Sequence, residues 1–158
     1  MPALQGEYYC KVDAKGRIHM PGKLLSQLHE NYRDKFVINR GFEKHLNIYP
    51  RNVWDRLSAQ INKLSTLDTQ ARTTMRFILA GASYLDLDSA DRILVSKQQK
   101  MYADIDKKVV LLAFKNKIEL WSEEKYVENF VKTPDLSSGN FSEDILRSID
   151  DNVDVLDI

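Results

Sequence analysis

Apolar and polar residues along the chain form two similar patterns that predict pairs of β-strands. Residues 36–39 and 47–49 are rich in Phe, Val, Ile and Tyr and bracket a short polar turn. Residues 109–114 and 118–121 repeat this arrangement. Because β-branched and aromatic runs around a short polar turn are typical of hairpins, we predict one such hairpin in each half of the chain.

Elsewhere, apolar residues recur at a spacing of three and four, which predicts helices. Pro21 suits a first helical turn, and Asp68 and Ser96 are suited to cap the helices that follow them. The acidic pair at 123–124 complements the dipole of a helix that begins at Ser122. The predicted helices contain Leu24, Leu25 and Leu28; Val53, Trp54, Leu57, Ile61 and Leu64; Ala71, Met75, Ile78 and Leu79; and Met101.

The chain contains an internal repeat. The stretch CKVDAKGRIHMP returns in weaker form as LDLDSADRILVS, so that Asp13 and Arg17 match Asp88 and Arg92 at an offset of 75. The two predicted hairpins match at an offset of 72. A half of about 50 residues is too small to stabilise its own core comfortably, so we expect an α+β protein in which both copies close one β core.

This pattern divides the chain into four parts. We predict a first repeat over 5–53, linking helices over 54–80, a second repeat over 81–131 and a flexible acidic tail over 132–158. After residue 132 there are seven acidic residues and one arginine, a charge of −6; since the whole chain has a formal net charge of zero, the body carries +6. A basic body is compatible with a nucleic-acid partner.

The four-residue turn that starts each repeat has recognisable chemistry. Asp13 at its start and Gly16 at its end are favoured turn residues, and Gly16 can adopt a positive φ. In the second copy, Ala90 and Asp91 replace the lysine and the glycine, which makes that turn locally acidic. We therefore expect the second turn to persist but to lose affinity for phosphate, which favours a structural or interfacial role.

These segments carry a resemblance to a known family. GEYYCKVDAKGRIHMP, FVINRGFEKHLNIYP and LDLDSADRI resemble the MraZ family, the duplicated relatives of the AbrB/SpoVT-type swapped-hairpin DNA-binding proteins, over roughly residues 5 to 130. The resemblance implies two tandem AbrB-like β-hairpin repeats closing one pseudo-two-fold β-barrel with peripheral helices. It also implies a transcriptional regulator of the division and cell-wall gene cluster that assembles into rings and binds repeated promoter DNA.

The family motif falls on the two turns. A turn that projects Lys15 and Arg17 could place an ammonium group on phosphate and a guanidinium on phosphate or guanine. We expect Asp13 to orient Arg17 or to hold the turn through backbone amides. Lys23 and Arg40 are further candidate positive charges. The candidate DNA-binding residues are Lys11, Asp13, Lys15, Gly16, Arg17, Asp88 and Arg92.

Other kinds of chemistry have little support in the sequence. The three histidines have no carboxylate or cysteine at ligand spacing, and no phosphate-binding glycine loop or nucleophile elbow is present. We therefore predict no enzyme activity, no metal and no cofactor. The alternative is an oligomeric scaffold or adaptor that has lost specific DNA binding. We assign the aromatic residues Tyr49, Trp54, Trp121 and Tyr126 to core packing rather than to base stacking.

Composition also predicts a cellular location. The longest apolar runs fall far short of the roughly 20 residues needed to cross a bilayer, and the first residues lack an apolar signal core. The lone Cys10, which we expect to be buried in a strand, has no second cysteine for a disulfide. We therefore expect a cytoplasmic, nucleoid-associated protein without a membrane partner.

Overall fold

The computed structural model describes residues 3–28 and 30–132. The chain divides into two compact units, residues 1–126 and 127–158. The first unit contains, in chain order, β1 (Leu4–Lys11), β2 (Arg17–His19), α1 (Gly22–Leu25), η1 (Glu30–Tyr32), β3 (Lys35–Arg40), β4 (Leu46–Pro50), α2 (Arg51–Ile61), α3 (Thr69–Ala80), β5 (Ser83–Asp86), β6 (Arg92–Leu94), α4 (Lys97–Tyr102), β7 (Lys108–Lys115), β8 (Lys117–Ser122) and α5 (Glu123–Tyr126).

The second unit is described only at its beginning. Val127–Val131 form a π-helical turn, η2, in which the N–H of Lys132 donates to the carbonyl of Val127 at 2.8 Å. The predicted flexible tail lies outside the described residues, apart from Lys132.

The predicted helices and hairpins form, but α1 ends before Leu28 and α2 ends before Leu64. Asp68 caps α3 by accepting a hydrogen bond from the N–H of Gln70 at 3.0 Å. Ser96 and Gln99 form a capping box at the start of α4, which satisfies two backbone donors at once. The two predicted hairpins are β3–β4 and β7–β8.

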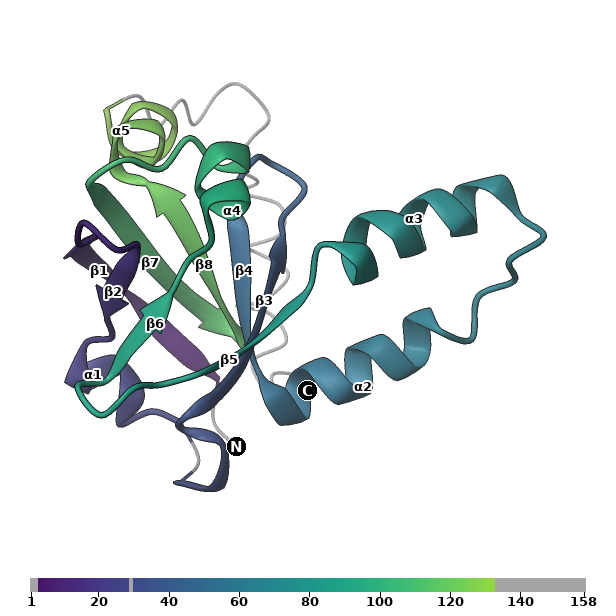
Figure 1. The fold of residues 1–158 in the computed structure, drawn as a ribbon, viewed down its shortest axis with the longest axis horizontal. Coiled ribbons are helices and arrows are strands. Elements are labelled where there is room, and N and C mark those ends of the chain that lie inside the picture. Colours follow the sequence, from purple (N-terminus) through teal and green to yellow (C-terminus); the bar gives the residue numbers. More distant parts are fainter. Residues whose placement is uncertain (1–2, 29, 133–158) are drawn as a thin grey trace, which may run out of the picture. The chain divides into compact units, whose positions relative to one another are not determined.

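The strands of the two repeats are exchanged across one sheet. Its order is β1-β7-β8-β4-β3-β5, so the first strand of each repeat pairs with the hairpin of the other repeat (Figure 1). Strands β2 and β6 form a separate two-stranded sheet, which we call the ribbon. The mixed α+β architecture is confirmed. The closed barrel is not, because the six-stranded sheet ends at the edges β1 and β5.

The strand registers follow the pseudo-two-fold relation that the repeat predicts. In the sheet, Asn47 lies opposite Glu119, its match at the offset of 72. In the ribbon, Ile18 lies opposite Ile93, its match at the offset of 75. Asn47 and Ile18 are thus each paired with their own copy in the other repeat, at the centre of the pseudo-symmetry. This pairing requires the two repeats to fold together.

The core lies between the ribbon and one face of the sheet. Ile18 and Ile93 are fully buried and pack in the same cluster as Phe36, Leu46 and Leu120. Side chains alternate across a strand, so this burial leaves the neighbours of both isoleucines facing outward. The ribbon therefore packs on the core through its central apolar pair.

The aromatic residues behave as predicted, whereas the cysteine differs in part. Trp54, Trp121 and Tyr126 are buried, and Tyr49 packs at a tilt against Trp54 with ring centroids 5.7 Å apart. These side chains are therefore not available as a base-stacking platform. Cys10 is half-buried rather than buried, because it lies toward the end of the edge strand β1.

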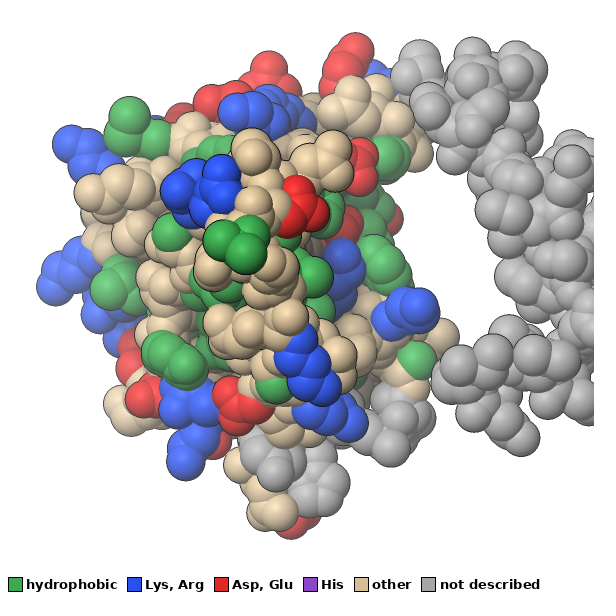
Figure 2. Space-filling model, turned by 90° about the vertical axis from the view of Figure 1, so that its right-hand side faces the viewer, with side chains coloured by type: hydrophobic (Ala, Val, Ile, Leu, Met, Phe, Trp, Pro, Cys, Tyr) green, Lys and Arg blue, Asp and Glu red, His purple; other side chains and the backbone are tan. Residues whose placement is uncertain are grey.

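The linking helices α2 and α3 extend from one side of the sheet as an arm (Figure 1). α2 contacts β3 and β4, while α3 contacts β3. The connection at the tip of the arm carries Leu64 and Leu67, of which Leu67 is 90% exposed. Figure 2 views the unit from the side on which the arm projects, where Lys and Arg side chains lie among apolar ones.

Candidate nucleic-acid interface

The carboxylate of Asp13 organises the first loop, residues 13–16. Its Oδ1 accepts hydrogen bonds from the N–H groups of Lys15 and Arg17, both at 2.9 Å. Its Oδ2 accepts from Nε of Arg17 at 3.1 Å. Both predicted roles of Asp13 are therefore present, since it holds the turn and also orients the guanidinium.

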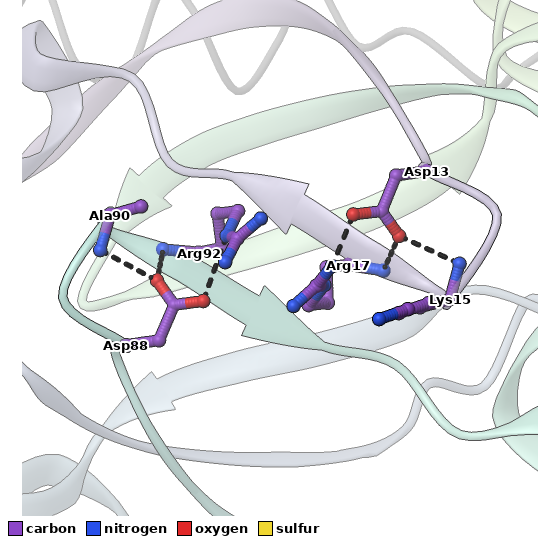
Figure 3. Close-up of polar contacts among 6 residues, drawn as sticks. All are labelled: Asp13, Lys15, Arg17, Asp88, Ala90 and Arg92. Carbon is purple, nitrogen blue, oxygen red and sulfur yellow. Dashed lines mark hydrogen bonds and ion pairs between the residues drawn. The ribbon is translucent and has the colours of Figure 1, made fainter.

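The second loop, residues 88–91, has the same geometry. Oδ1 of Asp88 accepts from the N–H groups of Ala90 and Arg92, both at 2.9 Å, and Oδ2 accepts from Nε of Arg92 at 2.8 Å. Figure 3 shows the two aspartate–arginine pairs toward opposite ends of the ribbon. The loss of the lysine and the gain of Asp91 therefore change the charge of the second loop but not its hydrogen bonds.

The last residue of each loop has a positive φ, 83° at Gly16 and 58° at Asp91. The carbonyl of Gly16 accepts from the N–H of Val95 at 2.9 Å, and that of Asp91 accepts from the N–H of Met20 at 2.8 Å. A Cβ on Gly16 would lie 2.8 Å from the carbonyl oxygen of Val95. Glycine at this position therefore satisfies both the conformation and the close approach of the other repeat.

The two arginines lie on the ribbon and not at the loop tips. Since Ile18 and Ile93 point into the core, the outer face of the ribbon consists of the residues on either side of them. The expectation that the turn projects Arg17 thus needs correction, because Arg17 is the first residue of β2, while Lys15 is exposed within the loop itself. The outer face contains Arg17, His19, Arg92 and Leu94.

Two of these residues, His19 and Leu94, are not among the candidates predicted from the sequence. Leu94 lies opposite Arg17, and His19 lies opposite Arg92. The sequence signal that could have found them is the match of Ile18 with Ile93, which places their neighbours on the opposite face once the two strands are known to pair.

Comparison with known proteins identifies the family. The family described as "MraZ protein, putative antitoxin-like" matches residues 3–77 and again residues 78–148. The chain belongs to the MraZ family. The two MraZ matches together cover almost the whole chain and divide it in the region that links the two repeats.

Individual MraZ relatives cover most of the chain. A protein of Flavobacterium psychrophilum named "Transcriptional regulator MraZ" is 33% identical over 96% of this chain and 97% of its own length. Proteins with the same name from Halothermothrix orenii and Natranaerobius thermophilus are 37% and 35% identical. They cover 77% and 89% of this chain, and 82% and 95% of their own lengths.

The loop contacts of this MraZ-family chain lower the pKa of both loop aspartates. For Asp13, the N–H of Arg17 lowers the pKa most, partial burial opposes this, and the N–H of Lys15 with the Arg17 guanidinium adds to the decrease. The same causes lower the pKa of Asp88, through Arg92 and Ala90. Both carboxylates are therefore charged while they hold the arginines in place.

These lowered pKa values predict how the first loop responds to acid. Because the folded pKa lies below the unfolded value, the stabilisation is complete above the ordinary value of 3.8 and is lost as the pH falls through the folded pKa. We expect the amide NMR signals of Lys15 and Arg17 to titrate with a midpoint below 3.8 and to stop titrating in Asp13→Asn. The amides of Ala90 and Arg92 should still titrate in that variant. A midpoint at or above 3.8 would contradict this account of the loop.

The other predicted cations differ in their availability. Lys11, Lys15 and Lys23 are exposed. Arg40, in contrast, donates to the carbonyls of Arg76 and Phe77 at 3.2 and 3.0 Å. Arg40 therefore satisfies the end of α3, and it is removed from the set of candidate DNA-binding cations.

A buried polar cluster occupies the face of the sheet away from the ribbon. Nε2 of His45 lies 3.0 Å from Glu119 and 3.1 Å from Asn47, and Nε1 of Trp121 donates to Glu119 at 3.0 Å. Sequence spacing gave His45 no carboxylate partner, because the pairing of β4 with β8 brings Glu119 to it from the other repeat. This contact links the two repeats.

Within residues 3–28 and 30–132, no group of three or more His, Cys, Asp or Glu side chains is placed to hold a metal ion. Over the same residues, no helix has the length and apolar character of a membrane span.

Proposed function

We propose that this MraZ-family chain is a sequence-specific DNA-binding transcriptional regulator that reads duplex DNA through the first loop and the outer face of the ribbon. The observation that carries the proposal is the fixed guanidinium of Arg17. Asp13 holds its Nε, while no described residue hydrogen-bonds its two terminal nitrogens. Those nitrogens are the donors that make a bidentate contact to guanine or phosphate.

The shape of the ribbon supports the proposal. A two-stranded β-ribbon fits the major groove of B-DNA, where side chains on its outer face reach the base edges. On this face Arg17 can donate to guanine, and the exposed Leu94 can contact a thymine methyl group. Lys15 in the loop and Lys11 before it can reach the phosphates on either side of the groove. Gly16 lets the loop pass close to the other repeat.

The second loop has a different part in this proposal. Asp88 presents Arg92 to the same face, but Asp91 and the missing lysine lower the local positive charge. We expect Arg92 to contact a base edge less strongly than Arg17 does, with the loop around it serving a structural role. The proposed parts of the chain remain the two repeats over 5–53 and 81–131, the linking helices over 54–80 and the tail over 132–158.

The proposed assembly is a ring-shaped homo-oligomer that meets tandem repeats in the promoter of the division and cell-wall gene cluster, in the nucleoid. One loop makes few contacts, but several loops on one particle convert weak contacts into high avidity when the DNA repeats match their spacing. The apolar Leu64 and Leu67 exposed on the arm support self-association. Sedimentation velocity tests the proposed ring. We expect an oligomer, and a monomer at micromolar concentration would contradict the proposal.

The test of the proposed function is the affinity of the wild-type protein for two labelled duplexes. One is taken from immediately upstream of the gene that encodes the chain, and the other is a scrambled duplex of the same composition. We expect tight binding to the upstream duplex that weakens steeply with salt, and far weaker binding to the scrambled one. Equal weak binding to both would favour the scaffold or adaptor, the alternative that the acidic second loop supports.

A further inference from the structure

The backbone contacts before the two loops bring opposite charges to them. The N–H of Val12, next to the first loop, donates to the carbonyl of Lys107 at 2.9 Å. At the equivalent place beside the second loop, the N–H of Leu87 donates to the carbonyl of Asp34, also at 2.9 Å. The same backbone contact thus places a lysine beside the first loop and an aspartate beside the second.

A second lysine reaches the first loop from α4. A Cβ placed on Gly16 would lie 3.6 Å from Nζ of Lys100. The matching position in the first repeat, 75 residues earlier, is the buried Leu25 of α1. α4 therefore presents an ammonium group to the first loop, where α1 contributes an apolar side chain to the core.

The strand register adds a like-charged pair beside the first loop. Lys11 and Lys108 are directly opposite one another at the end of the β1–β7 ladder. The equivalent pair beside the second loop is Asp86 and Lys35. Like charges directly opposite on a sheet repel, and opposite charges attract. The pair beside the first loop is therefore repulsive, whereas the pair beside the second loop is attractive. We call Lys11, Lys100, Lys107 and Lys108 the lysine cluster.

The lysines of the cluster are not paired with carboxylates of the described residues. Among residues 3–28 and 30–132, no carboxylate forms an ion pair with any of its members. Asp13 is engaged by Arg17, and Asp104 pairs with Lys125 at 2.5 Å. Asp106, next to the cluster in the chain, is exposed and leaves a clear excess of positive charge. Such a surface attracts a polyanion and binds it with release of counterions.

On the basis of the proposed function, we propose that the lysine cluster binds the phosphate backbone of the DNA that the ribbon reads. Lys100 and Lys107 of the second repeat contact the DNA strand that lies next to the first loop. Phosphate contacts fix position and orientation but carry no sequence information. Because the cluster flanks only the first loop, it anchors one end of a pseudo-symmetric ribbon. The second repeat thereby gives the ribbon a defined direction on the DNA.

The test uses the double variant Lys100→Gln/Lys107→Gln with the upstream and scrambled duplexes, titrated at several salt concentrations. Each phosphate contact contributes about 0.9 to the slope of log affinity against log salt, so we expect the slope to fall by about 2. Affinity should fall by the same factor on both duplexes, which leaves their ratio unchanged. The charge-preserving Lys100→Arg/Lys107→Arg should restore the slope, and thermal melts verify that the variants fold.

The matched control is Lys35→Gln/Lys63→Gln, which removes the same charge from the exposed Lys35 beside the second loop and from the exposed Lys63 in the connection after α2. We expect its salt slope to stay close to the wild-type value. Equal slopes for the two glutamine double variants would overturn the role of the lysine cluster. If the wild-type protein itself shows no preference for the upstream duplex, the proposed function is overturned instead. The two failures are therefore distinguishable.

Discussion

Replacing Arg17 with alanine is expected to abolish the preference for the upstream duplex. The change removes the guanidinium that Asp13 fixes on the outer face of the ribbon, while the backbone contacts of the loop remain. A bidentate arginine contact contributes about 1–3 kcal/mol for each engaged loop, and more for an assembly that engages several. Fluorescence anisotropy with the upstream and scrambled duplexes measures the loss as a change in their affinity ratio.

Arg92→Ala is the matched control, because Asp88 holds Arg92 in the same geometry on the same ribbon. We expect it to lower affinity less than Arg17→Ala does, since its loop has an acidic residue in place of glycine and no lysine. If Arg17→Ala leaves the affinity ratio unchanged, Arg17 does not read the bases. If Arg92→Ala has the larger effect, the second loop is the principal reader.

Ile93→Ala is expected to be the most destabilising of the substitutions considered for the ribbon. Ile93 is fully buried and lies opposite Ile18, its copy in the first repeat, so truncation leaves a cavity where the ribbon joins the core. Truncating a buried isoleucine to alanine costs about 2–5 kcal/mol of unfolding free energy. Urea unfolding followed by circular dichroism should show the loss as a lower midpoint with little change in slope.

Leu94→Ala provides the control on the same strand. Its side chain is 54% exposed on the outer face, so we expect a change in unfolding free energy within about 0.5 kcal/mol. If both alanine variants unfold at the same urea concentration, the ribbon is not anchored through Ile93. If Ile93→Ala is folded at low temperature, it should bind the upstream duplex there and lose binding as the ribbon detaches on warming.

Local chemistry made much of the fold predictable from the sequence. Asp13 and Gly16 specify their turn within four residues, and Asp68 and Ser96 specify helix starts through bonds to nearby amides. The repeat also predicted that the two halves fold together. These features are visible in the sequence because every interaction involved joins residues that are close along the chain or related by the repeat.

The remaining features depend on contacts between distant residues. Nothing near Arg17 in the sequence indicates that it lies on a ribbon opposite Leu94, because that pairing arises from the exchange of strands between repeats. The contact of His45 with Glu119 and the approach of Lys100 to Gly16 have the same origin. Arg40 also departs from the prediction, because it bonds to the end of α3, which is distant from it in the chain.

The most direct measurement for the reading surface is site-specific photo-crosslinking to the labelled upstream duplex. A benzophenone side chain would replace Lys15 in the first loop or, in a control protein, Leu67 at the exposed tip of the arm. We expect a crosslink to the duplex from position 15, reduced by competition with unlabelled upstream duplex, and none from position 67. Bound duplex that crosslinks from position 67 and not from position 15 would contradict it.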